Sequence, residues 1–125
     1  MTKSELGKRI RDVAYLEGDF TLRSGRKSKY YLDKYLFETQ PDILREVGRL
    51  LADYATASTT RIAGAELGGV PLATAASLAA GLPFAIIRNA KKDYGTGRPF
   101  EGLLLPSDSV LLVQDIAAAA QVGRL

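Results

Sequence analysis

The chain contains neither cysteine nor histidine, and this absence limits the chemistry that its 125 residues can carry out. Disulfide bonds, thiolate catalysis and imidazole general-base catalysis are all excluded. A metal ion would have to be held by oxygen atoms, which favours Mg²⁺ or a similar hard cation. The remaining reactive groups are carboxylates, lysines and arginines, and three stretches combine such groups with glycine or with the end of an apolar run.

The first stretch, GAELGGVP at residues 64–71, follows an apolar run and opens a predicted helix. Adjacent Gly68 and Gly69 allow backbone conformations that are closed to other residues, so several N–H groups can converge on one anion beside a helix N-terminus. The same pattern is also typical of a tight strand-to-helix turn that binds nothing. The stretch therefore indicates either an anion site or a plain turn.

The second stretch, RNAKKDYGTGRPFEG at residues 88–102, is polar throughout. A loop of this length in a compact chain is either a functional lid or a solvated segment. As a lid it would bring cations onto a phosphate-rich ligand and use two glycines as hinges. The cations are Arg88, Lys91, Lys92 and Arg98, and the glycines are Gly95 and Gly97.

The third stretch, VLLVQD at residues 110–115, carries an acid to the end of a predicted strand. The Asp115 carboxylate could accept hydrogen bonds from sugar hydroxyls or help to position hydrated Mg²⁺. Aspartate at a strand end is also a common turn former or helix cap. Four alanines, residues 117–120, follow where a polar, glycine-rich loop would be usual.

A basic segment, RSGRKSKYYLDK at residues 23–34, concentrates the positive charge of the chain. Such a cluster can attract phosphate or nucleic acid, but a solvated loop with lysines explains it equally well. The net charge of +3 is too small to favour nucleic acid as a partner. We expect no nucleic-acid partner.

Helical periodicity and turn signals predict the elements that precede these stretches. Residues 2–16 form an amphipathic helix with a capping box between Thr2 and Glu5. The segment 20–38 alternates in its apolar parts and turns at Ser24 and Gly25, which predicts short strands around a basic loop. A second helix starts at Pro41. Its apolar face comprises Ile43, Leu44, Val47, Leu50, Leu51 and Tyr54.

From residue 61 onward, strand and helix patterns alternate: RIAGA, VPLATAASLAA, LPFAIIR and SVLLVQD. Apolar strands joined by a helix predict an α/β fold with a parallel sheet covered on both faces. In such a fold the loops at the carboxyl ends of the strands bind the ligand, and all three chemical stretches lie there. The length predicts one domain, residues 1–125.

Four segments in this order resemble the orotate phosphoribosyltransferases of the type I phosphoribosyltransferase fold. They are FTLRSGRKSKYYLD (20–33), GAELGGVPLA (64–73), RNAKKDYGTG (88–97) and VLLVQDIAAAAQ (110–121). The resemblance implies a parallel sheet flanked by helices, with an N-terminal helix and short-strand hood in residues 1–40. Residues 41–125 would then be an incomplete Rossmann-like core.

The resemblance also implies a reaction, in which orotate displaces pyrophosphate from 5-phosphoribosyl 1-diphosphate (PRPP) to give orotidine 5′-monophosphate. Mg²⁺ would be carried by PRPP, and Asp115 would face the ribose hydroxyls. Arg88 and Lys92 would neutralise the charge of the leaving pyrophosphate, with Lys92 coming from the second subunit of a homodimer with shared sites. Orotate and PRPP would be contacted by Arg23, Tyr30, Tyr31, Glu66, Leu67, Gly68, Gly69, Lys91, Tyr94, Ala118 and Ala119.

The chain departs from the family pattern at the phosphate sites. Gln114 replaces the first of two acids, and Ala117 to Gln121 replace the Thr-Thr-Gly-Gly-like stretch that cradles the 5′-phosphate. Loss of two hydroxyl-to-phosphate bonds would weaken PRPP binding by roughly two to four decades. Because the family continues with further strands past the position of Leu125, we expect a fragment or an altered record of a longer member.

Two other functions remain open: a regulator that binds PRPP or a nucleotide without turnover, and an inactive fragment. A different acceptor base is a further alternative. The first residues, MTKSELGKRI, contain no apolar segment of a secretory signal, so we expect a cytoplasmic protein. No apolar run approaches the roughly 20 residues that cross a bilayer, so no membrane association is expected.

Overall fold

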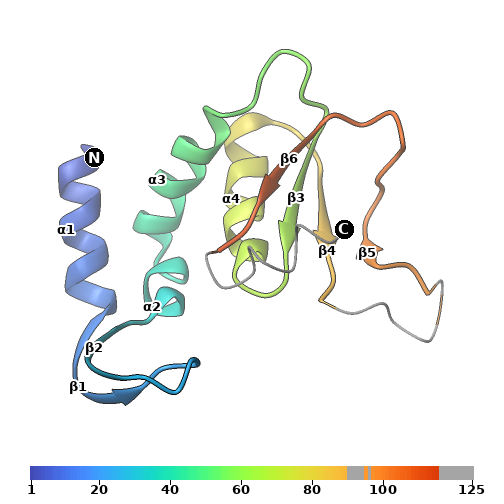
Figure 1. Cartoon of the computed structure of the whole chain (residues 1–125). Helices are drawn as coiled ribbons and strands as arrows, with labels where there is room; N and C mark the ends of the chain where they lie inside the picture. Colours follow the sequence, from blue (N-terminus) through green and yellow to red (C-terminus); the bar gives the residue numbers. More distant parts are fainter. Residues whose placement is uncertain (90–94, 96, 116–125) are drawn as a thin grey trace. The chain divides into compact units, whose positions relative to one another are not determined.

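The computed structural model describes residues 1–89, 95 and 97–115 (Figure 1). The chain divides into two compact units, Met1–Glu46 and Val47–Leu125. The boundary falls inside one helix, a few residues after the expected limit between residues 40 and 41. The single domain of residues 1–125 stays a prediction.

The first unit begins with helix α1, Lys3–Ala14. The Thr2 hydroxyl oxygen accepts a hydrogen bond from the Glu5 N–H at 3.0 Å, which confirms the Thr2 half of the predicted capping box. The helix ends before Leu16, and the predicted helical position of that residue is wrong. Leu16 lies in a strand and pairs with Tyr31, because cross-strand pairing replaces the helical hydrogen bonds there.

The next two strands, β1 (Tyr15–Thr21) and β2 (Lys27–Leu32), form an antiparallel hairpin around the predicted turn. Gly25 in the turn has a φ of +88°, a conformation that a side chain would disfavour. Gly18 lies within β1, where the register shifts between Glu17 and Phe20. The strand is therefore irregular at this glycine.

Two short segments complete this unit. Helix α2, Lys34–Glu38, occupies residues for which the alternation predicted strand, and this prediction is wrong. The Asp33 carboxylate caps the helix by accepting from the Tyr35 N–H at 3.0 Å, so local capping overrides the alternation. Helix α3, Pro41–Ala52, begins as predicted but ends before Tyr54, which is 73% exposed.

An ion pair fastens α1 to the start of α3. Arg9 Nε lies 2.9 Å from Asp42 Oδ2. The hydrogen bond from the Arg9 guanidinium holds the pKa of the Asp42 carboxyl below its ordinary value. Ile43, the next residue of α3, is fully buried.

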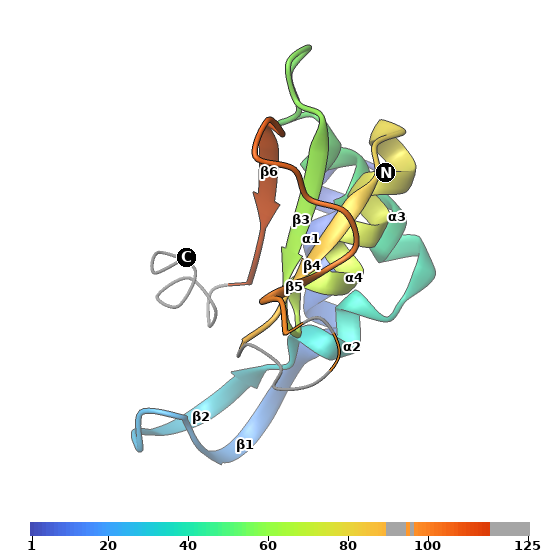
Figure 2. The ribbon, with the colours of Figure 1, turned by 90° about the vertical axis from the view of Figure 1, so that its right-hand side faces the viewer.

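The second unit contains a four-stranded sheet in the order β5-β4-β3-β6 (Figures 1 and 2). The strands are β3 (Arg61–Ala65), β4 (Phe84–Ile87), β5 (Phe100–Glu101) and β6 (Val110–Val113). β3 is parallel to both β4 and β6, which confirms the predicted parallel core. β5 is antiparallel to β4 and lies in the segment that was predicted as a polar loop.

Helix α4, Gly69–Ala80, lies against the sheet (Figure 2). The approach is close: a Cβ placed on Gly64 would lie 2.5 Å from the Gly69 carbonyl oxygen. Ala73 and Ala76 are fully buried beneath this contact. Small residues thus bring the start of α4 down to the carboxyl end of β3. Among the described residues, no helix combines the length and apolar character needed to cross a membrane.

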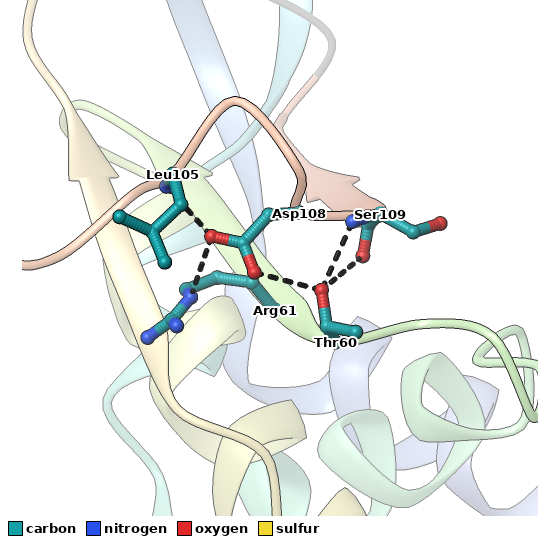
Figure 3. Close-up of polar contacts among 5 residues, drawn as sticks. All are labelled: Thr60, Arg61, Leu105, Asp108 and Ser109. Carbon is teal, nitrogen blue, oxygen red and sulfur yellow. Dashed lines mark hydrogen bonds and ion pairs between the residues drawn. The ribbon is translucent and has the colours of Figure 1, made fainter.

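A polar cluster holds the opposite, amino-terminal ends of β3 and β6 together (Figure 3). The Asp108 carboxylate accepts hydrogen bonds from the Leu105 N–H at 2.7 Å, the Thr60 hydroxyl at 2.8 Å and the Arg61 Nε at 3.3 Å. The Thr60 hydroxyl also accepts from the Ser109 N–H at 2.9 Å. These bonds lower the pKa of Asp108, chiefly through the Leu105 N–H.

Candidate active site

The turn between β3 and α4 leads into a helix whose N-cap residue has no side chain to cap it. Gly68 is the N-cap residue, and no side-chain hydrogen bond closes this end of α4. The N–H groups of a helix start and the positive end of the helix dipole both favour an anion. The turn thus has the features of a phosphate site.

The two glycines of this turn serve a purpose different from the predicted one. Gly68 has φ −65° and ψ −25°, which any residue adopts, and Gly69 has no positive φ. Close packing of the neighbouring segment explains the two glycines instead. A Cβ on Gly68 would overlap the Asp115 carboxylate, and a Cβ on Gly69 would lie 2.7 Å from the Val113 carbonyl oxygen. Glycine here lets the end of β6 approach the turn.

Strand register brings the ends of three strands level. Ala65 of β3 pairs with Ile87 of β4, and Gly64 pairs with Val113 of β6. Arg88 follows β4 directly, and Gln114 follows β6. The structure therefore brings Arg88 and Asp115 to the carboxyl edge of the sheet, as predicted. The β3–α4 turn lies between them.

Two polar atoms at this edge are buried without a hydrogen-bond partner among the described residues. They are Nε of Arg88, a donor, and Oε1 of Gln114, an acceptor. Buried polar atoms normally have a hydrogen-bond partner. Two such atoms without a partner, at the carboxyl edge of a parallel sheet, are typical of a ligand site. A ligand that offers a phosphate oxygen to Arg88 and a hydroxyl to Gln114 would satisfy both atoms.

Glu66 has both of its polar groups engaged with the end of β4. Its N–H donates to the Ile87 carbonyl oxygen at 2.9 Å, and its Oε2 accepts from the Asn89 N–H at 3.1 Å. Its amide is therefore not one of the N–H groups of this turn that could converge on an anion. Val70 N–H is likewise bonded to the Leu67 carbonyl oxygen.

The predicted orotate residues lie in the first unit. Arg23 is exposed in the hairpin turn. Tyr30 stacks on Tyr15 with ring centroids 5.9 Å apart, and Tyr31 packs at a tilt on Phe20 at 5.6 Å. Because successive residues of a strand point to opposite faces, the two tyrosine rings occupy different faces of the hairpin. A ligand on one face of the hairpin would meet one of these rings.

Several predicted site residues lie outside the described part of the chain: Lys91, Lys92, Tyr94, Ala118 and Ala119, together with the rest of the alanine run. Two groups that the structure places beside Glu66 and Arg88 were not predicted from the sequence, the Asn89 N–H and the Pro99 carbonyl oxygen. Both are backbone groups, so the residue types in the sequence could not predict them. No cluster of three or more metal-ligating side chains occurs within the described ranges.

A helix start, an arginine and an aspartate at the carboxyl edge of a parallel sheet are features that α/β proteins with phosphorylated ligands share. No protein-family model matches the chain. It is 47% identical over 104 residues to an orotate phosphoribosyltransferase of Methanocella arvoryzae, covering 83% of this chain and 59% of the relative. It is 38% identical over 122 residues to one of Natronomonas pharaonis, covering 97% and 69%.

Solved structures agree with these relatives. The orotate phosphoribosyltransferase of Mycobacterium tuberculosis, in complex with Fe(III) dicitrate, superposes with a TM-score of 0.77 at 28% identity, covering 97% of this chain and 75% of that one. Its complex with PRPP gives a TM-score of 0.68 at 27% identity, covering 87% and 61%. The chain belongs to the orotate phosphoribosyltransferase family. It spans about three fifths of the length of the Methanocella relative.

Proposed function

We propose that this chain carries the phosphoribosyl-transfer site of an orotate phosphoribosyltransferase. The reaction joins orotate to the anomeric carbon of PRPP, releases pyrophosphate and yields orotidine 5′-monophosphate for pyrimidine synthesis. One observation carries the proposal: in a member of this family, the uncapped start of α4, Arg88 and Asp115 meet at one edge of the sheet.

The described residues suit a reaction in which negative charge collects on a leaving pyrophosphate. N–H groups at the start of α4 and the Arg88 guanidinium would bind the phosphate oxygens and stabilise that charge. The Asp115 carboxylate and Gln114 Oε1 would accept hydrogen bonds from the ribose hydroxyls and orient the sugar. Such a site has no need of the histidine that the sequence lacks.

The roles of the remaining residues are part of the same proposal. Arg23 and the aromatic faces of the hairpin would contact orotate or the substrate phosphates. Lys91, Lys92 and Tyr94 would act from the polar loop, Lys92 across a homodimer. Ala118 and Ala119 would lie beside the 5′-phosphate. A cytoplasmic location completes this proposal.

Mg²⁺ is proposed as the cofactor. Among the described residues, Asp115 and Glu66 bring carboxylates to this edge, and Glu66 is already bonded to the backbone. This donor set suits an ion held mainly by the oxygens of PRPP and by water, with Asp115 nearby. When bound, Mg²⁺ would neutralise charge on the diphosphate.

The test is turnover of orotate with PRPP and Mg²⁺, followed by orotate absorbance. Arg88→Ala should lower kcat/KM by roughly a hundredfold, because one donor to the developing charge is lost. Arg45→Ala, which removes an exposed arginine from α3, is the matched control and should match the unaltered protein. Absence of turnover at high protein concentration would contradict the catalytic proposal.

The alanine run favours a second candidate, a protein that binds PRPP or a nucleotide without turnover. Residues 117–120 offer no hydroxyl to the 5′-phosphate, which weakens a substrate site. Titration calorimetry with PRPP and with orotidine 5′-monophosphate separates the two candidates. Binding of either compound without turnover would support the second.

A further inference from the structure

The backbone is held on both sides of Arg88. The Arg88 N–H donates to the Pro99 carbonyl oxygen at 2.9 Å, which ties the residue to the segment that leads into β5. The next peptide N–H, that of Asn89, donates to the Glu66 carboxylate at 3.1 Å. The two peptide groups that flank the Arg88 Cα are thus bonded to two different segments.

This double attachment fixes the direction in which the Arg88 side chain leaves the backbone. Its Nε is buried and has no hydrogen-bond partner in the described part of the chain, so this donor lacks a protein acceptor there. A side chain whose backbone is already ordered loses less conformational freedom when it binds a ligand. The ordered backbone therefore lowers the entropic cost of binding an anion to Arg88.

A carboxylate in the anion-binding turn would be expected to weaken anion binding, because like charges repel. Glu66 nevertheless stands at the start of that turn. Its two contacts with the end of β4, through its own N–H to Ile87 and through its carboxylate to Asn89, explain the placement. A charged acceptor makes a stronger hydrogen bond to a backbone N–H than a neutral one does.

We propose that Glu66 is a positioning residue that acts through Arg88. Its carboxylate holds the Arg88–Asn89 peptide so that the guanidinium is preorganised for the pyrophosphate oxygens of the substrate. This inference rests on the proposed function, which makes pyrophosphate the ligand of Arg88. It assigns to the Glu66 side chain a role separate from the backbone amides of the turn.

The test is calorimetric binding of inorganic pyrophosphate in the presence of Mg²⁺. Glu66→Ala should weaken binding about tenfold, the effect of one charge-assisted hydrogen bond. Glu66→Gln should stay within about threefold of the unaltered protein, because the amide oxygen still accepts from Asn89. Asp53→Ala, which removes an exposed carboxylate next to α3, should change nothing.

A double-mutant cycle shows whether Glu66 acts through Arg88. In a protein that already carries Arg88→Ala, the change Glu66→Ala should cause no further loss of pyrophosphate affinity. Equal or tighter binding by Glu66→Ala alone, or a full additional loss in the double variant, would overturn the inference. If the unaltered protein binds no pyrophosphate, the proposed function fails as well. Binding that depends on Arg88 and not on Glu66 would overturn this inference alone.

Amide hydrogen exchange of Asn89, measured by NMR without ligand, gives an independent readout. Exchange at this N–H should be about tenfold faster in Glu66→Ala than in the unaltered protein and should stay slow in Glu66→Gln. Equal exchange in all three proteins would contradict the positioning role whatever the binding data show.

Discussion

Asp115 lies two residues past β6, with its carboxylate against Gly68 at the point where a Cβ would overlap it. A glycine at this position is therefore part of the way the acid is placed. The geometry links two residues that stand far apart in the sequence and that the proposed mechanism uses together. It also separates a packing role for Gly68 from a conformational one, since its φ and ψ are ordinary.

This contact predicts the effect of Gly68→Ala. The added methyl group would displace the Asp115 carboxylate, so PRPP binding measured by calorimetry should weaken about tenfold or more. The melting temperature should change little, because the displaced group is the end of a side chain. Gly7→Ala is the control, since nothing lies within 4 Å of that Cβ. Unchanged PRPP affinity in Gly68→Ala would contradict the placement of Asp115.

At the scale of elements, the amino ends of β3 and β6 are fastened by the Asp108 cluster, while their carboxyl ends form the site. Arg61 and Asp108 have side chains only 13% and 7% exposed. The cluster connects the segment before β6 to the start of β3 (Figure 3). Rigid attachment at one end of the two strands allows the other end to present side chains in a fixed register.

The lowered pKa of Asp108 predicts a pH dependence of stability. A carboxyl whose pKa is lower in the folded state stabilises the fold fully above its unfolded value, 3.8, and loses this contribution as the pH falls through the folded value. Asp108→Asn should therefore be less stable than the unaltered protein in urea at pH 7, and the difference should shrink below pH 3.8.

The control for that measurement is Asp12→Asn, which changes an exposed carboxylate on α1. Its stability should follow that of the unaltered protein at each pH. A deficit of Asp108→Asn that stays constant down to the lowest pH would show that the Asp108 charge contributes nothing.

At the scale of the whole molecule, the proposed function includes a second subunit. The hairpin residues Arg23, Tyr30 and Tyr31 belong to the first unit, and Arg88 and Asp115 to the second. Lys92 lies outside the described residues and is proposed to act across a homodimer. A closed two-fold dimer would then hold two sites, each built from both subunits.

Subunit mixing tests this arrangement. Lys92→Ala and Asp115→Ala should each be nearly inactive, but a mixture refolded or exchanged together should recover about a quarter of the full activity, because half of the dimers are mixed and each has one intact site. Sedimentation should give twice the mass of the chain. A dimer whose mixture stays inactive would contradict shared sites.

Sequence patterns predicted β3, α4, β4 and β6 because their apolar residues have clear periods and their limits carry glycine or proline. They failed at Leu16 and at residues 34–38, where strand pairing with Tyr31 and the Asp33 cap decided between two patterns of similar strength. β5 was not predicted because a strand of two residues is too short to show an alternating pattern of apolar and polar residues.

The sequence by itself determined the family and the residue types at the site, since a glycine pair, Arg88 and Asp115 follow predictable strands in a known order. Only the tertiary structure decided how these groups meet. The Glu66 bond to Asn89 and the space that Gly68 leaves for Asp115 join backbone and side-chain atoms from separate strands. Their spacing depends on the register of β3 with β4 and β6, which forms only when the sheet is assembled.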